Sequence, residues 1–148
     1  MSITDDLRER RLAIVREHME SENRHEFDVT LGTFEHPRYE LIPTGDVFDG
    51  AEEVADYYAK SRAVFPDQRN ENTVLHMTDD GAVIAEFDLL GTHEGELRGV
   101  AGTGRTFRCR MCAIFEFGAD TDRIVCERVY FDQATIASQL FGEQAPAP

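Results

Sequence analysis

Hydrophobic residues in the first half of the chain recur every three or four positions, which is the spacing of one face of an α-helix. The pattern predicts helices over residues 5–22, 24–33 and 51–64. Between the second and third of them, Pro37 excludes helical geometry at the preceding residue, so a turn to extended chain and a short strand are expected there. The inner stripe of the first helix is predicted to hold Leu7, Ile14, Val15 and His18.

The second half of the chain alternates apolar and polar residues, which is the period of a β-strand. Strands are predicted over residues 69–78, 82–92, 106–117 and 123–131, and a last helix over 133–141. One side of the longest strand holds Phe107, Cys109, Met111, Ala113, Phe115 and Phe117. Helices followed by strands and short turns indicate an α+β fold, with helices packed on one face of a curved antiparallel sheet. The length predicts a single domain over residues 1–142, followed by a disordered tail over 143–148.

The junction of the last strand and the last helix is the first candidate for chemistry. Simple alternation places Ile124, Cys126, Arg128, Tyr130 and Asp132 on one side of the strand. Asp132 is then an acid/base candidate with Arg128 and Tyr130 as hydrogen-bonding neighbours. A second interpretation is that Asp132 only caps the helix, because aspartate is a preferred N-cap residue. The opposite side (Val125, Glu127, Val129 and Phe131) is equally apolar, so a one-residue slip or a bulge would turn Asp132 outward.

Other titratable and aromatic residues have both a functional and a structural interpretation. His93 ends the strand that carries Phe87 and Leu89 on one side, so it is either a catalytic partner or a structural histidine. His36 lies in a loop, where it is exposed or reaches a pocket mouth. Tyr57 and Tyr58 point inward by helical spacing, so they pack in the core, line a pocket, or do both.

Composition narrows the possible partners. The chain has 148 residues and a net charge of −14, which opposes binding to nucleic acid and to anionic membranes. No apolar run approaches the ~20 residues of a membrane span. The three cysteines do not form a disulfide framework, and Cys109 and Cys112 lie three apart on a strand, so they face opposite sides. We therefore expect free thiols, a cytoplasmic location and no metal site.

Several phrases of the sequence resemble one protein family. They are HPRYELIPTG at 36–45, the segment 49–58 (DG, one variable residue, then EEVADYY), GTHEGEL at 91–97, TGRTFR at 103–108 and ERVYFD at 127–132. Together they resemble the SnoaL-like cyclases, often called ester or polyketide cyclases, of the nuclear transport factor 2-like superfamily. The resemblance extends over residues 5–141.

The resemblance implies a cone-shaped α+β fold with an apolar pocket between helices and sheet, and chemistry without a cofactor. It implies that an aspartate near the end of the last strand is the acid/base group, which here is Asp132. It also places His93 near the pocket. The tryptophan that many members carry in the last strand is absent, and this chain has Arg128 and Tyr130 there. Homodimers that pair through the outer face of the sheet are common in the superfamily.

Two functions are consistent with these observations. The first is a small cofactor-independent enzyme of cyclase, isomerase or hydrolase type that acts on an apolar small molecule. Its catalytic residues would be Asp132 and His93, and its substrate-binding residues Tyr130, Arg128, Tyr57, Tyr58, Met111 and His36. The second is a module on the same fold that binds a small molecule or a protein without chemistry. We predict one cavity that Asp132, Tyr130, His93, Met111 and a tyrosine of the third helix all face. We also predict a homodimer formed by the mixed outer face, which holds Glu86, Asp88, Arg108, Arg110, Cys112 and Ile114.

Overall fold

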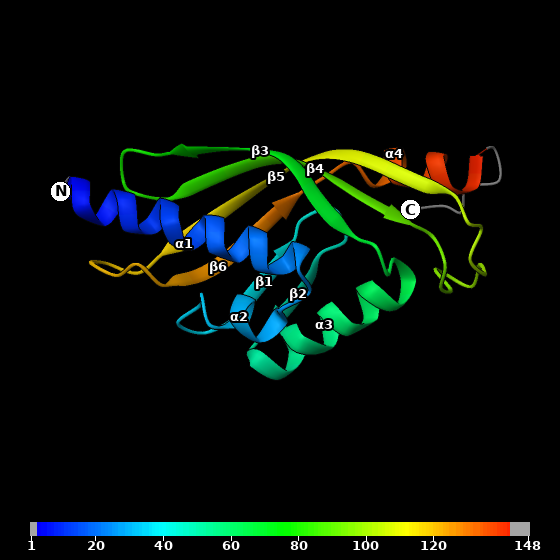
Figure 1. Cartoon of the computed structure of the whole chain (residues 1–148), viewed down its shortest axis with the longest axis horizontal. Helices are drawn as coiled ribbons and strands as arrows, with labels where there is room; N and C mark the ends of the chain where they lie inside the picture. Colours follow the sequence, from blue (N-terminus) through cyan, green and yellow to red (C-terminus); the bar gives the residue numbers. More distant parts are fainter. Residues whose placement is uncertain (1–2, 143–148) are drawn as a thin grey trace.

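The computed structural model describes residues 3–142, which form four helices and a curved sheet (Figure 1). The predicted tail over 143–148 lies outside these residues. The helices are α1 (Asp5–Asn23), α2 (Phe27–Leu31), α3 (Ala51–Val64) and α4 (Gln133–Phe141). The strands are β1 (Arg38–Leu41), β2 (Asp46–Asp49), β3 (Arg69–Met77), β4 (Val83–Thr92), β5 (Thr106–Phe117) and β6 (Ile124–Tyr130). The predicted α+β fold is confirmed.

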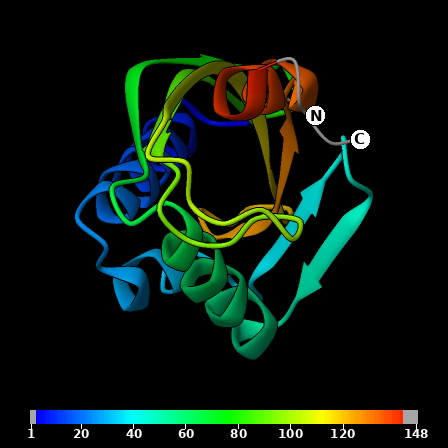
Figure 2. The same ribbon diagram turned by 90° about the vertical axis from the view of Figure 1, so that its right-hand side faces the viewer.

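The six strands follow the order β2-β1-β6-β5-β4-β3. All neighbours are antiparallel except β1 and β6, which run parallel. The sheet curls around its interior without closing, and α1 and α3 lie along its concave side (Figure 2). The pattern of polar and apolar residues does not predict β2, because this edge strand has only four residues and only Phe48 among them is partly buried.

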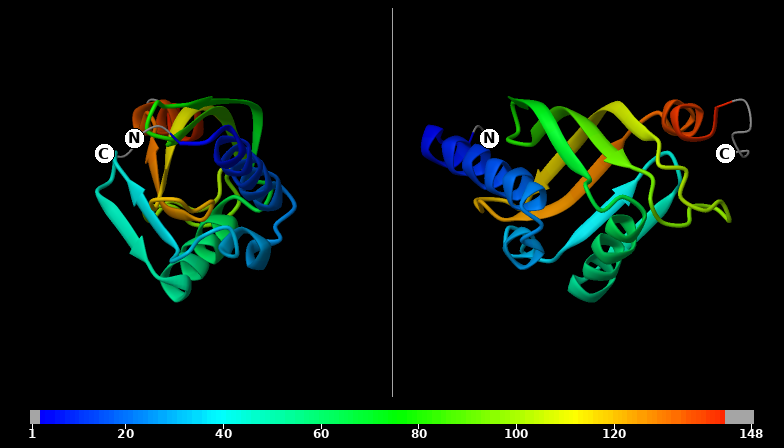
Figure 3. Two further views of the ribbon diagram at one scale, coloured as in Figure 1. Left: turned by 90° about the vertical axis from the view of Figure 1, so that its left-hand side faces the viewer. Right: turned by 45° about the vertical axis from the view of Figure 1, so that its right-hand side comes forward.

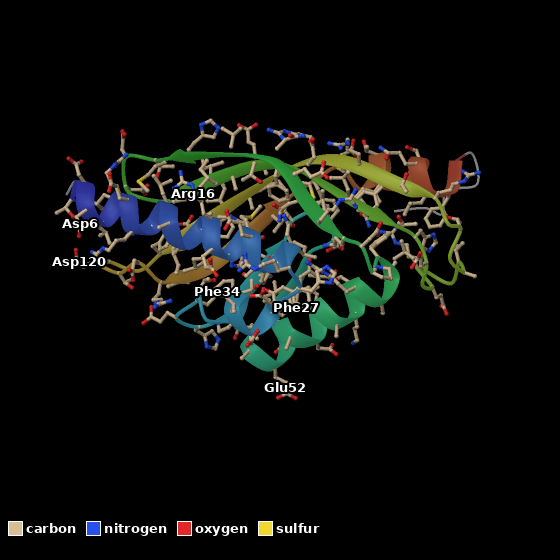
Figure 4. The ribbon with its side chains drawn as sticks, in the orientation of Figure 1. Asp6, Arg16, Phe27, Phe34, Glu52 and Asp120 are labelled. Carbon is tan, nitrogen blue, oxygen red and sulfur yellow. The ribbon has the colours of Figure 1, made fainter. Side chains whose placement is uncertain are left out.

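Local sequence explains where the helices begin. The side chain of Thr4 accepts a hydrogen bond from the backbone N–H of Leu7, and Asp5 and Asp6 place negative charge in the first turn of α1. On α3, the exposed Glu52 projects away from the body of the molecule, whereas Phe34 lies in the core between α1 and the sheet (Figure 4). Predicted and observed bounds agree for α3, for β5 and for α4.

Arg11 ties together the end of the molecule where α1 begins, which we call the closed end. Only 3% of this residue is exposed. Its guanidinium donates to three backbone carbonyls at 2.9 Å each, those of Gly81, Gly118 and Thr121. These carbonyls belong to the β3–β4 and β5–β6 turns, so one side chain joins α1 to both turns. Helix α4 and segment 93–105 lie at the opposite end, which we call the open end (Figure 3).

A β-bulge in β6 decides which residues of that strand face the interior. Phe117 pairs with Ile124 and Glu116 with Cys126, so Val125 is an extra residue with no partner on β5. Because the bulge shifts the alternation by one, Ile124 faces the interior near its start and Glu127 and Val129 face it further along. Simple alternation predicts the opposite orientation for the second half of the strand, and that prediction is wrong.

Candidate functional site

A cavity of about 440 Å³ opens between α3, α4, β1, β2 and the turn at Leu97–Arg98. Its wall is largely apolar, and aromatic rings from distant segments of the chain supply much of it. These rings belong to Phe48, Tyr57, Phe65, Phe107, Phe131 and Phe141. A cavity of this size and polarity suits a small molecule with an apolar body.

Strand register sets the depth of each residue in the cone. Leu41 on β1 pairs with Val129 on β6, and both line the cavity. Tyr39 pairs with Glu127 two residues closer to the closed end, and it faces the same side because side chains alternate along a strand. Tyr39 and Glu127 therefore form the next layer of the interior, beneath the floor of the cavity.

That inner layer is a buried polar network centred on His18. His18 Nε2 lies 3.0 Å from the hydroxyl of Tyr39, which donates to Glu22 Oε1 at 2.8 Å. The hydroxyl of Tyr58 is 2.6 Å from that of Tyr39. His18, Tyr39, Tyr58 and Glu127 are each at most 5% exposed. The network therefore combines two tyrosines, two carboxylates and a histidine in the core.

The hydrogen-bond partners of His18 are those that an imidazolium requires. Thr33 donates its hydroxyl hydrogen to the carbonyl of Thr30 at 2.6 Å, so it can only accept from His18 Nδ1 at 2.9 Å. On the other side, the Tyr39 hydroxyl accepts from Nε2 because its own hydrogen goes to Glu22. Burial lowers the pKa of His18, but the adjacent carboxylates of Glu127 and Glu22 outweigh it and raise that pKa to about 9.

The two carboxylates of the network differ. Burial raises the pKa of Glu22, but His18, Arg62 and the Tyr39 hydroxyl bring it down to about 2. Burial dominates at Glu127 and raises its pKa. Glu127 Oε1 lies 2.7 Å from His18 Nε2 as an ion pair, and its contacts within residues 3–142 lack the geometry of a hydrogen bond. Glu127 thus keeps a buried oxygen available to a proton.

Within residues 3–142, one group of side chains could offer three ligand atoms to a metal ion. These atoms belong to His18, Glu22 and Glu127 and lie within 4.8 Å of one another. A metal ion there would have to displace the Nε2 proton, which lies beside the Tyr39 hydroxyl and the two carboxylates. The network has a protonated imidazole at its centre. The residues present therefore suit a proton more directly than an ion.

Polar groups at the cavity itself are few. The hydroxyl of Tyr57 makes no hydrogen bond with any residue in 3–142, and its ring stacks on Phe48 with centroids 4.6 Å apart. Burial raises its pKa, which keeps it a hydrogen-bond donor. At the mouth, Lys60 pairs with Asp56 at 2.8 Å, and Arg98 occupies a left-handed backbone conformation with φ 52°.

Asp132 is exposed at the start of α4 and does not line the cavity. Its carboxylate accepts from the backbone N–H groups of Ala134 and Thr135 at 3.0 and 3.3 Å, and from the Thr135 hydroxyl at 2.8 Å. The Thr135 hydrogen bond is the main reason that its pKa is lowered. The orientation predicted for Asp132 is wrong, since the bulge at Val125 turns it outward and its carboxylate caps the helix.

The same bulge turns Arg128 and Tyr130 to the outer face. Tyr130 is 40% exposed, and Arg128 pairs with Glu116 at 2.8 Å and with Glu40 at 3.5 Å. Their predicted place in the cavity is therefore wrong. His36 is also outside the site, because its exposed ring pairs with Asp49 at 3.2 Å.

His93 lies behind the cavity wall. It is fully buried, and its ring is in contact distance of Phe65 and Phe141, which line the cavity. The backbone N–H of Thr103 donates to Nδ1 at 3.3 Å, so the ring proton is on Nε2, and this N–H has no partner in residues 3–142. The prediction that His93 shares the apolar side of β4 with Phe87 and Leu89 is thus correct, but His93 does not reach the cavity surface.

Met111 and Tyr57 line the cavity, as predicted, whereas Tyr58 lies beneath it in the His18 network. Sequence reasoning missed Glu127, Glu22 and Tyr39 as site candidates and assigned His18 to the core. The available signal was Glu127 itself, a charged residue on the strand side that otherwise carries Val125, Val129 and Phe131.

Comparison with known families gives a match over residues 13–140 to the model of the SnoaL-like polyketide cyclase. The chain belongs to this family. Membership supports an enzyme that processes a small molecule. A search of curated proteins gave no match.

Solved structures share the fold at low sequence identity. A candidate polyketide cyclase of Xanthomonas campestris has a TM-score of 0.82 at 20% identity and covers 90% of this chain and 98% of its own. A phenazine biosynthesis-related protein of Pseudomonas aeruginosa has a TM-score of 0.76 at 22% identity. The match covers 97% of this chain and 90% of that protein. A Catenulispora acidiphila protein described as having a ketosteroid isomerase-like fold has a TM-score of 0.73 at 15% identity. The match covers 91% of this chain and 97% of that protein. The cone is thus the ketosteroid isomerase-like, or nuclear transport factor 2-like, fold.

Among residues 3–142, no helix of this family member is both long and apolar enough to cross a membrane.

Proposed function

We propose that this SnoaL-like protein is a small, cofactor-independent enzyme that uses acid/base chemistry on an apolar small molecule in the cavity. The observation that carries the proposal is Glu127. It is a buried carboxylate of raised pKa on the inward side of β6, one layer beneath the cavity floor. A carboxylate of raised pKa is a better general base near neutral pH than an ordinary one.

In this proposal the reacting carbon of the ligand lies at the floor formed by Leu41 and Val129. Because Glu127 lies beneath this floor, it takes the proton through one bridging water, and the imidazolium of His18 at 2.7 Å keeps the carboxylate in place. The Tyr57 hydroxyl donates to the ligand carbonyl, where negative charge develops when the proton leaves. Aldol ring closure and isomerisation both begin with such a proton transfer from carbon, whereas in hydrolysis the same carboxylate would take the proton from the attacking water.

The alternative is a module that holds an apolar ligand without chemistry. Two observations favour it: the carboxylate of Asp132 is fully used in capping α4, and no histidine lines the cavity within residues 3–142. A direct test of proton transfer separates the two functions.

The test uses 2-tetralone, an apolar ketone with exchangeable hydrogens next to its carbonyl, in D₂O with NMR detection. We expect the protein to accelerate deuterium uptake over buffer, and Glu127→Gln to lower this rate by ~10²–10⁴, the range for loss of a general base. Asp132→Asn is the matched control and should retain the rate. Binding of tetralone without accelerated exchange, or equal rates for wild type and Glu127→Gln, would leave the binding module as the function.

We also propose that two copies pair through the outer face of the sheet. On this face Arg108 and Arg110 bind Asp88 at 2.6 and 3.4 Å, and Val74 is 49% exposed. Since the charges are already paired within one chain, they can be buried together at lower cost than single charges. Light scattering at micromolar concentration should give twice the chain mass of 16.8 kDa, and a monomer mass would contradict the proposal.

A further inference from the structure

The side chain of Gln68 is a polar group in the cavity that the proposed reaction does not use. Gln68 follows α3 and directly precedes β3, is 7% exposed, and lines the cavity. Its backbone is fixed, since its N–H donates to the carbonyl of Phe65 at 3.1 Å and its carbonyl lies 3.3 Å from His25 Nε2. Its side-chain amide makes no hydrogen bond with any residue in 3–142.

The neighbouring Asn70 shows what a buried amide does when its role is structural. It is 8% exposed and lies in β3, two residues after Gln68. Its Nδ2 donates to the carbonyl of Met19 at 3.1 Å, and its Oδ1 faces Asn23 Nδ2 at 3.4 Å and the Thr73 hydroxyl at 3.4 Å. Buried amides are normally partnered in this way, because an unmade hydrogen bond is costly. Gln68 has no such protein partner within residues 3–142, and its amide is not sealed in the core but borders the cavity.

We propose that the Gln68 amide recognises a neutral ligand group with a carbonyl oxygen and an N–H or O–H on neighbouring atoms, such as a carboxamide. An amide offers a donor and an acceptor side by side, so it pairs with the complementary edge through two hydrogen bonds. The group is neutral because the charged residues of the lining (Asp46, Asp56, Lys60 and Arg98) are all exposed, which leaves an ion at Gln68 without a counter-charge. The inference rests on the proposed function only in taking the cavity as the ligand site.

Three probes of nearly the same shape test this recognition: 2-naphthamide, 2-acetylnaphthalene and 2-isopropylnaphthalene. They offer a donor with an acceptor, an acceptor alone, and neither. Dissociation constants from calorimetry are compared for the wild type, for Gln68→Met, which keeps the side-chain length without the amide, and for Gln133→Met. Gln133 lines the mouth and is only partly buried, so it controls for the same change of side chain near water.

Gln68→Met should raise the dissociation constant of naphthamide about 10-fold and that of acetylnaphthalene about 3-fold, because each hydrogen bond has a modest net strength. The dissociation constant of isopropylnaphthalene should not change. Gln133→Met should affect the three probes alike. An equal effect of Gln68→Met on all three probes would mean that water alone satisfies the amide, and it would overturn the inference while leaving the proposed function intact. Failure of every probe to bind the wild type would overturn both the inference about Gln68 and the proposal that the cavity is the ligand site.

A second measurement does not depend on the folding of a variant. The side-chain amide resonances of Gln68 in the wild type should shift on addition of naphthamide and stay in place with isopropylnaphthalene. Equal shifts with both probes would report only the nearby aromatic ring and would count against recognition by hydrogen bonding.

Discussion

The charge of His18 should control the stability of this protein above neutral pH. Glu127 and Glu22 outweigh burial and raise the pKa of this buried histidine from 6.5 to about 9. A group whose pKa is higher in the folded chain stabilises the fold fully below its unfolded pKa, and this stabilisation is lost as the pH rises through the folded pKa. The interval from 6.5 to about 9 corresponds to about 3 kcal/mol, since each pKa unit is worth ~1.4 kcal/mol.

The measurement is the free energy of unfolding in urea at pH values from 6 to 10, with a reductant present for the three cysteines. Far-UV circular dichroism follows unfolding, because the chain has no tryptophan. The wild type should lose about 3 kcal/mol more than His18→Gln over this range, because a neutral glutamine has no proton to give up. His76→Gln is the matched control, because it makes the same substitution at a half-exposed histidine outside the core.

Parallel profiles for wild type and His18→Gln would refute the reasoning, because they would mean that His18 is neutral throughout. If His18→Gln does not fold, Glu127→Gln gives the same information. It removes the carboxylate that contributes most to the raised pKa of His18. The loss of stability should then begin at a lower pH than in the wild type, and an unchanged midpoint would contradict the role of Glu127.

Three further predictions concern single positions. Arg11→Lys should lower the free energy of unfolding in urea by about 3 kcal/mol, because one ammonium cannot reach all three carbonyls that the guanidinium binds. The control is Arg10→Lys at an exposed ion pair, which should leave this free energy unchanged. Asp132→Ala should lower the melting temperature by ~2–5 °C through loss of the α4 cap, whereas Asp132→Asn should keep it, and equal losses would contradict the capping role. Gly95→Ala should lower the free energy of unfolding by more than about 2 kcal/mol, because the new Cβ would overlap the carbonyl oxygen of Ala63. Gly99→Ala has nothing near its Cβ and only the strain of φ 78°, so it should cost about 1 kcal/mol in the same chemical denaturation.

Local patterns in the sequence predict most of the fold. The bounds of α3 and β5 follow from helical spacing and from an alternation that continues unbroken through β5. Strand β2 could not be predicted, since its four residues are almost entirely exposed and it is defined by its pairing with β1. An edge strand of this kind is a property of the tertiary structure rather than of its own sequence.

The site could be predicted only in part, and for the last strand the reason is one residue. Met111 and Tyr57 were placed by periodicities that no irregularity disturbs. The last strand contains the bulge at Val125, which reverses inside and outside for every later residue of β6. Strict alternation therefore selects Tyr130 and Asp132, and the true inward side holds Glu127. Gln68 lies in the connection between α3 and β3, where neither period applies.

Lys60 gives this protein a convenient chemical handle. It carries the only side-chain amine in the sequence, its side chain is 78% exposed, and it lies at the mouth of the cavity. A reagent that acylates amines should thus modify side chains at this one position. A dye attached there would report occupancy of the cavity without an engineered label. A bulky adduct at the same place would obstruct entry, so protection from acylation becomes a screen for ligands.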